Sequence, residues 1–238
     1  MRLPILMYHK VDRMPPGARY VRNYVLPEQF EAQLAALARW GYRTVSFGEW
    51  LAYRRGAADL PRRPIIVTFD DGYRSTYEIA WPLLQRFGYT ATVFLVSDLI
   101  GKTNAWDVHE VQEPLLGRAE IAEMQRGGIG FESHTKTHAA LTLIEPDRAM
   151  EELTAARVTL AGLLGTPVRV LCYPYGKNNP AVRAMTREAG YEAAVMAGSR
   201  MNTRRTDPFR LKRIGIDYRM TIAQLRWKLF RLRWLAYA

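Results

Sequence analysis

The chain has 238 residues and a formal net charge of +11, from 34 Lys or Arg against 23 Asp or Glu. Its one cysteine, Cys172, excludes an intramolecular disulfide. No linker, internal repeat or low-complexity tract divides the sequence. We therefore expect one domain over residues 1–238, which is a common length for an α/β barrel.

Short apolar runs alternate with helix-like stretches, which indicates a mostly parallel sheet covered by helices. Strands are expected near residues 3–8, 64–69, 90–96, 128–133, 168–173, 192–197 and 211–216. Helices are expected at 27–40, 73–87, 145–164 and 180–189. This pattern predicts an α/β fold with about seven mostly parallel strands. If the sheet closes into a distorted (β/α) barrel, the loops that follow the strands build its site.

The first two of these strands end in polar residues. Residues 3–8 lead to His9, and residues 64–69 lead to Asp70 and Asp71 before Gly72. Adjacent side chains on an extended backbone point in different directions, so one carboxylate can hold a metal while the other meets a substrate. A helix N-cap followed by a turn acid explains an isolated Asp-Asp-Gly equally well.

Two histidines, His134 and His138, follow the expected strand at 128–133. If this segment turns helically, both imidazoles face one ion. With one carboxylate they make a three-ligand site with open coordination, as catalytic zinc sites have. Surface or capping histidines explain the pair taken alone, but the pair of acids favours a metal site.

The segment 171–176, Leu-Cys-Tyr-Pro-Tyr-Gly, ends another expected strand. Its proline and glycine predict a tight, rigid turn. Such a turn can aim a backbone N–H at a ligand and so hold an oxyanion. An ordinary turn with two packed tyrosines is the alternative.

Together these segments resemble the polysaccharide deacetylases, also called the NodB-homology domain or carbohydrate esterase family 4. Residues 68–72 match the family's Thr-Phe-Asp-Asp-Gly motif, and residues 134–138, His-Thr-Lys-Thr-His, match its paired-histidine motif, His-Ser/Thr-x-x-His. The resemblance extends over nearly the whole chain and implies a NodB-like barrel. It also implies that Asp70 is the general base and that a divalent metal is held by Asp71, His134 and His138. Zinc is the simplest choice, with cobalt or nickel as alternatives.

The sequence departs from the family pattern at two places. Cys172 and Tyr173 stand where many members have an arginine that steadies the catalytic Asp, and no histidine follows His138 to act as general acid. In both respects the chain is similar to the rearranged deacetylases of poly-N-acetylglucosamine, whose last strand is transposed to the start. The resemblance makes His9 the expected acid. A closed barrel permits the transposition, because its first and last strands are neighbours.

The implied reaction removes an N-acetyl group from an N-acetylated saccharide, either a polymer or a lipid-linked glycan. A metal-held water attacks the amide while Asp70 takes its proton. The metal and the backbone N–H of Tyr175 hold the oxyanion, and His9 protonates the leaving amine.

Three further side chains are candidate substrate-binding residues. Trp106 and Tyr173 offer aromatic faces that suit a pyranose ring. Arg210 is a candidate for the missing arginine, since arginine pairs with carboxylates.

Two other functions fit the same residues. One is a catalytically silent carbohydrate- or membrane-binding module that has kept the barrel. The other is a deformylase or O-deacetylase of a related sugar. A base beside a metal favours an enzyme, because a binding module has no need of one.

Basic charge gathers late in the chain, where residues 200–238 hold eleven Lys or Arg and two acids. We expect a basic amphipathic helix over 221–235, with Leu225, Leu229 and Leu232 on one face. Such a helix fits an anionic membrane surface, or it caps the barrel with its cations in water. Nucleic acid is not an expected partner, because no recognition motif accompanies the charge.

The start of the chain bears on localisation. Residues 1–4 lead directly into the first expected strand and leave no room for a signal peptide. No apolar run is long enough to span a bilayer. The sequence therefore predicts a cytoplasmic protein, free or peripheral to the inner membrane.

Overall fold

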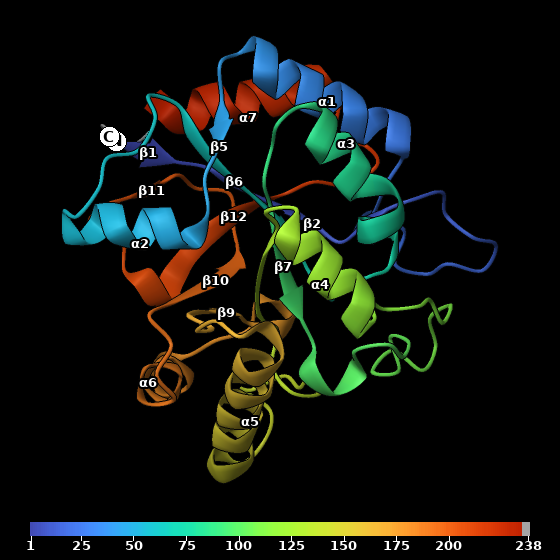
Figure 1. Ribbon diagram of the computed structural model, residues 1–238, viewed down its shortest axis with the longest axis vertical. Coiled ribbons are helices and arrows are strands. Elements are labelled where there is room, and N and C mark those ends of the chain that lie inside the picture. Colours follow the sequence, from blue (N-terminus) through green and yellow to red (C-terminus); the bar gives the residue numbers. More distant parts are fainter. Residues whose placement is uncertain (235–238) are drawn as a thin grey trace.

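The computed structural model describes residues 1–234, and at its centre is a closed barrel of parallel strands (Figure 1). Around the barrel the strand order is β2 (Ile5–Tyr8), β12 (Leu211–Gly215), β10 (Ala193–Ala197), β9 (Val170–Cys172), β8 (Gly130–Ser133), β7 (Thr92–Leu95) and β6 (Pro64–Phe69). Pairing of β6 with β2 closes the ring. These are the seven strands expected from the sequence, so the predicted barrel is confirmed.

Strand β2 is the first barrel strand in the sequence. It lies between β12, the last barrel strand in the sequence, and β6, the second. Its Leu6 pairs with Ile214 of β12 on one side and with Val67 of β6 on the other. The first strand in the sequence thus neighbours the last, as the transposed arrangement requires. His9, which directly follows β2, is thereby brought beside the end of β6.

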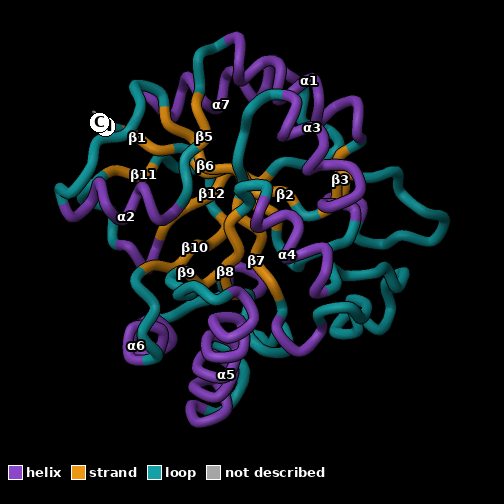
Figure 2. The backbone as a smooth tube through the Cα atoms, viewed as in Figure 1, coloured by secondary structure: helices purple, strands orange, loops and turns teal. Residues whose placement is uncertain are grey.

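Helices surround the strands, which are gathered at the centre of the molecule (Figure 2). The expected helices are present as α1 (Pro27–Arg39), α3 (Trp81–Arg86), α5 (Pro146–Leu164), α6 (Pro180–Glu188) and α7 (Ile222–Trp234). The helix expected at 73–87 is shorter and begins with a π-helical turn, Thr76–Ala80. Residue 235, predicted to end the last helix, lies outside the described residues.

Several shorter elements were not expected. The helices α2 (Phe47–Arg55) and α4 (Arg118–Arg126) occur in stretches expected to be irregular. The paired short strands are β1 (Arg2–Leu3) with β11 (Asn202–Thr203), β3 (Lys10–Val11) with β4 (Tyr24–Val25), and β5 (Arg43–Thr44) with β6. Within residues 1–234, no helix is both long and apolar enough to cross a membrane.

Two hydrophobic cores follow from the alternation of side chains along the strands. One fills the barrel and includes Ile66 of β6; the other lies between barrel and helices and includes Val67 and Phe69. Continuing this alternation, Thr68 and Asp70 point into the mouth of the barrel. The sequence of β6 therefore delivers a carboxylate to the interior just where the apolar filling ends.

Candidate active site

A cavity of about 330 Å³ lies where the barrel strands end. Its walls are formed by Met7, His9, Tyr20, Asn23, Asp70, Asp71, Trp106, Asp107, His134, His138, Tyr173, Tyr175, Gly176, Ala197 and Arg213. The cavity brings together every candidate residue inferred from the sequence except Arg210. Residues far apart in the chain meet here because parallel strands end on the same rim.

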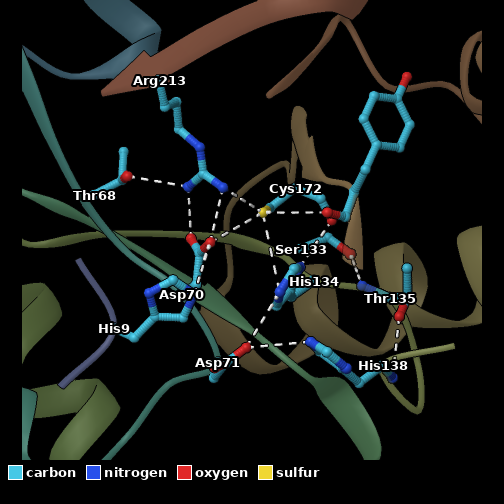
Figure 3. A network of polar contacts seen from close by, with 11 residues as sticks. His9, Thr68, Asp70, Asp71, Ser133, His134, Thr135, His138, Cys172 and Arg213 are labelled. Atoms are coloured by element: carbon cyan, nitrogen blue, oxygen red, sulfur yellow. Dashed lines mark hydrogen bonds and ion pairs between the residues drawn. The ribbon is translucent and has the colours of Figure 1, made fainter. Parts of the chain in front are cut away.

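Asp70 is held by a buried arginine that the sequence analysis did not identify (Figure 3). Arg213 donates to Asp70 Oδ1 at 2.6 Å and to Oδ2 at 2.7 Å, and also to the hydroxyl of Thr68 at 3.1 Å. This two-pronged geometry is the strongest that a guanidinium makes with a carboxylate. Burial alone would raise the pKa of Asp70, but the charge and hydrogen bonds of Arg213 outweigh it and leave that pKa below its ordinary value. Asp70 is therefore an anion at neutral pH.

Arg210, the residue proposed from the sequence for this place, is exposed and does not line the cavity. It ends a short 3₁₀ helix just before β12. Arg213 lies within β12, where alternation puts it on the same face as Leu211, whose side chain fills the barrel. The sequence did contain a signal for Arg213, because it is a single cation at an inward-facing position of an apolar strand.

Asp71, His134 and His138 converge on one point. Asp71 Oδ1 is 3.2 Å from His134 Nε2 and 3.3 Å from His138 Nε2, and all three side chains are buried. Burial works to raise the pKa of Asp71, but its contacts with both histidines hold it well below the ordinary range. Burial also lowers the pKa of His138, which favours the neutral imidazole that a metal binds.

These three residues fit a tetrahedral divalent metal. Ligand atoms about 2.1 Å from a tetrahedral zinc ion stand about 3.4 Å apart, close to the 3.2 and 3.3 Å that separate Asp71 Oδ1 from the two imidazole nitrogens. Asp71 Oδ1 is a buried oxygen without a hydrogen-bond partner within residues 1–234, as expected of an atom reserved for an ion. A second group, Asp70 with His134 and Cys172, also lies close enough, but there Arg213 already occupies the carboxylate. The first group is therefore the better metal site.

The ligand histidines are oriented by neighbouring groups. His134 Nδ1 lies 2.8 Å from the carbonyl oxygen of Cys172, to which it donates when Nε2 faces a metal. The turn that carries His138 is fixed from α5, where buried Glu152 accepts the backbone N–H groups of Lys136 and Thr137 at 3.0 and 2.8 Å. The loop is thus tied to the scaffold on both sides of the metal site.

Cys172 also contacts the carboxylate. Its Sγ is 3.5 Å from Asp70 Oδ2 and 3.1 Å from Arg213 Nη2. Burial raises the pKa of the Cys172 thiol, so the group is neutral and can donate its S–H to Asp70. Many of the deacetylases that the sequence resembles have an arginine at the position of Cys172. In this chain Cys172 still supports Asp70, through a weaker donor.

His9 enters the cavity from the N-terminal strand. Its Nε2 lies 3.8 Å from Asp70 Oδ2, and its side chain is 19% exposed. This places an imidazole with partial access to solvent beside the carboxylate. His9 and the Asp-Asp-Gly motif therefore meet in the same cavity.

Aromatic rings frame the metal site. Trp106 stacks on His138 with ring centroids 4.5 Å apart, and Tyr175 meets the same imidazole edge-on at 4.8 Å. Tyr175 is 54% exposed, whereas Tyr173 is buried and its hydroxyl donates to the carbonyl of Phe209. Trp106 and Tyr175 thus stand at the mouth, while Tyr173 belongs to the floor.

Three further polar side chains line the cavity: Tyr20, Asn23 and Asp107. Tyr20 precedes a short 3₁₀ helix and Asn23 ends it. The loop that contains this helix has no recognisable motif. Burial raises the pKa of Asp107, which lies close to Asp71. No local pattern marks these residues, because only the path of two long loops brings them to the cavity.

The backbone around the site is held in unusual conformations. Among residues 1–234, four residues other than glycine have positive φ: Asp71 (73°), Thr135 (68°), His138 (68°) and Tyr175 (60°). All four lie in the loops that build this cavity. Such conformations are costly for side chains with a Cβ, and they cluster at functional sites where the surrounding structure imposes them.

The structure is thus a parallel (β/α) barrel that has a buried carboxylate, an Asp–His–His triad able to hold a metal ion and an aromatic rim at its strand ends. The family model described as "Polysaccharide deacetylase" matches residues 57–194, more than half of the chain. The chain belongs to the polysaccharide deacetylase family, as its motifs predicted.

Individual relatives agree with this assignment. The poly-beta-1,6-N-acetyl-D-glucosamine N-deacetylase of Staphylococcus epidermidis is 26% identical, over 89% of this chain and 78% of the relative. The crystal structure of BC0361, a polysaccharide deacetylase from Bacillus cereus, is 28% identical with a TM-score of 0.82, covering 96% of this chain and 69% of that one. The Streptococcus pyogenes deacetylase PplD has the same fold, with a TM-score of 0.84 at 23% identity over 96% of this chain and 98% of that one.

Proposed function

We propose that this protein is a metal-dependent hydrolase that removes N-acetyl groups from an N-acetylated saccharide such as a poly-N-acetylglucosamine-like polymer or a lipid-linked glycan. The observation that carries the proposal is the convergence of Asp70, His9 and the Asp71–His134–His138 triad on one cavity. Family membership and the activity named for the Staphylococcus epidermidis relative support it.

Each group in the cavity has a proposed role. A divalent metal held by Asp71, His134 and His138, zinc being the simplest choice, supplies Lewis acidity for attack on the amide carbonyl. Asp70 accepts the proton of the attacking water, and its lowered pKa keeps it ionised for this task. Arg213 holds both oxygens of Asp70 and so fixes the direction in which the base acts.

The second half of the reaction needs an acid. As the C–O bond forms, the carbonyl oxygen gains negative charge, which the backbone N–H of Tyr175 stabilises. His9 then donates a proton to the nitrogen while the C–N bond breaks, giving acetate and an amine. The 3.8 Å separation of His9 from Asp70 puts the acid and the base within reach of one amide group.

The rim is proposed to bind the sugar. Trp106 and Tyr175 present aromatic faces beside the metal ligand His138, where the apolar face of a pyranose ring can stack. The open mouth at Tyr175 leaves room for a chain that continues beyond one sugar.

The test is acetate release from N-acetylglucosamine oligomers by zinc-loaded protein. We expect Asp70→Asn to lower kcat by about 10³-fold and His9→Ala by about 10²-fold. His109→Ala, which changes an exposed histidine outside the cavity, is the matched control and should leave the rate unchanged.

Other results would select a different function. Release of formate, or of acetate only from O-acetylated sugars, would replace the amide substrate by a formyl or ester group on the same site. Failure to bind zinc, cobalt or nickel would favour the catalytically silent binding module.

A further inference from the structure

The helices α1 and α7 lie side by side on the outside of the barrel (Figure 1). Leu225 and Leu229 of α7 are buried in the same core as Leu34 and Leu37 of α1. This packing fixes the orientation of α7 on the molecule. Its opposite side is therefore a rigid outer surface.

A shallow groove of about 780 Å³ lies on this outer surface between the two helices. Its main lining residues are Arg39, Trp40, Ile222, Arg226, Trp227 and Phe230, which we call the α1–α7 patch. Within the described chain, the residues that line the groove include two arginines and no acid. The patch is thus apolar at its centre and cationic at its edges.

The apolar part of the patch is in contact with solvent. Trp227 is 55% exposed and Phe230 is 61% exposed, two of the largest exposed apolar side chains among residues 1–230. With Ala223 and Arg226 they follow the i, i+3, i+4, i+7 spacing of one helical face. Leu225 and Leu229 are buried on the opposite side of the helix, so Trp227 and Phe230 face outward.

We propose that the α1–α7 patch docks the protein on an anionic lipid bilayer. Charge complementarity selects this partner, because residues 222–234 contain four Lys or Arg besides the aromatic residues and no acid. Tryptophan and phenylalanine insert at the boundary between headgroups and acyl chains, while arginine and lysine are attracted to anionic headgroups. A basic helix with aromatic residues on one rigid face satisfies both requirements at once.

The interaction is of the peripheral kind. Each Lys or Arg near an anionic surface contributes about 1 kcal/mol, and the apolar side chains add the energy of partial insertion. Salt screens the electrostatic contribution of the cations and leaves the contribution of the inserted apolar side chains nearly unchanged. Binding is therefore expected to weaken, but not to vanish, when the ionic strength is raised.

The experiment is co-sedimentation of the full chain with vesicles of phosphatidylcholine alone, or mixed with phosphatidylglycerol in about equal amounts. We expect much stronger binding to the mixed vesicles than to the neutral ones. Arg39→Gln with Arg226→Gln should weaken it about 30-fold, since two cations leave the surface. Trp227→Ser with Phe230→Ser should weaken it at least about tenfold.

Matched controls come from exposed residues outside the patch. Arg118→Gln with Arg126→Gln removes the same charge from α4, and Leu143→Ser with Val158→Ser removes exposed apolar side chains elsewhere. Neither control should change binding by more than about twofold. Because the four patch residues are outside the core, thermal unfolding of the variants should match the wild type.

Three results would overturn the proposal. The first is equal binding to neutral and anionic vesicles, and the second is equal loss in the patch variants and their controls. The third is a protein that does not bind vesicles but forms a concentration-dependent dimer in light scattering, where Trp227→Ser with Phe230→Ser abolishes the dimer. That result would assign the patch to a second copy of the chain.

Discussion

The adjacent residues His9 and Lys10 belong to two different clusters of buried charged groups. The clusters differ in whether their polar atoms have hydrogen-bond partners. His9 faces the cavity, where Asp70 and Arg213 are paired but Asp71 Oδ1 has no hydrogen-bond partner in the described structure. Lys10 is 1% exposed and is surrounded by partners of its own. Both clusters bury charge, but His9 lines the cavity at the strand ends and Lys10 does not.

The Lys10 cluster is closed. The ammonium group donates to the hydroxyl of Tyr24 at 3.0 Å and pairs with Glu113, and it lies 4.3 Å from the centre of the Tyr73 ring. Nearby, Glu110 accepts three backbone N–H groups of two loops. These contacts join the loop before α1 to the loop after β7.

The difference shows how a functional site is told apart from structural charge. Burial and an ion pair occur in both places, so neither feature identifies chemistry alone. What distinguishes the active-site cluster is unused bonding capacity directed into a space that a ligand can enter. In the Lys10 cluster the hydrogen-bonding groups contact one another and the backbone of two loops, and so hold these loops together.

The largest expected effect is loss of the metal. His138→Gln should abolish measurable acetate release and lower the zinc bound per chain, because one of three ligands is removed. Metal content measured by atomic emission, with His109→Gln as the control, checks this. Full zinc occupancy in His138→Gln would exclude the proposed triad.

Removing Arg213 tests the support of the proposed base. Arg213→Gln should lower kcat by about 10²-fold, because Asp70 loses its fixed orientation. The carboxylate then lacks the cation that lowers its pKa, so burial raises that pKa. The acid limb of the pH–rate profile should move up by about one to three pH units.

Arg210→Gln is the control for this measurement, since it removes an exposed arginine three residues away. A profile that shifts equally in both variants would point to net charge as the cause. An unshifted profile in Arg213→Gln would separate the acid limb from Asp70.

The Lys10 cluster should respond in stability more than in rate. Lys10→Met is expected to lower the free energy of unfolding by about 3 kcal/mol, because Glu113 loses its buried partner. At a temperature where the variant is folded, kcat should fall by less than about tenfold. Chemical denaturation and acetate release on the same samples provide the comparison.

A second substitution makes the test specific. Lys10→Met combined with Glu113→Leu should recover most of the lost stability, since no unpaired charge then remains. A loss of rate as large as that of Arg213→Gln would place Lys10 in the active-site cluster and break the comparison.

The smallest effect concerns Glu132, a carboxyl at the end of β8 that accepts the backbone N–H groups of Arg169 and Val170. Burial raises its pKa to about 8. Between its ordinary value and this one, the unfolded chain ionises while the folded carboxyl stays protonated, so rising pH reduces stability. Glu132→Gln should flatten the fall in Tm between about pH 5 and pH 8 without changing kcat. A fall as steep as that of the wild type would assign the pH dependence to another group.

Local patterns in the sequence determined much of this protein. Apolar runs located all seven barrel strands, and the motifs around Asp70 and His134 identified the family and predicted a ligand set whose members lie together in the structure. Helix α2 was missed although its capping box, Ser46 with Glu49, and its terminal Gly56 were visible. Its weak amphipathic pattern hid it, because a helix with few buried residues leaves little periodicity to read.

Tertiary structure alone decided which distant groups meet. Arg213 reaches Asp70 only because β12 and β6 both flank β2 in the closed barrel, and Lys10 finds Glu113 only across two folded loops. The groove between α1 and α7 likewise joins helices nearly 200 residues apart in the chain. Periodicity is a property of neighbours in sequence, whereas ion pairs and cavities depend on the closure of the barrel, which no local pattern encodes.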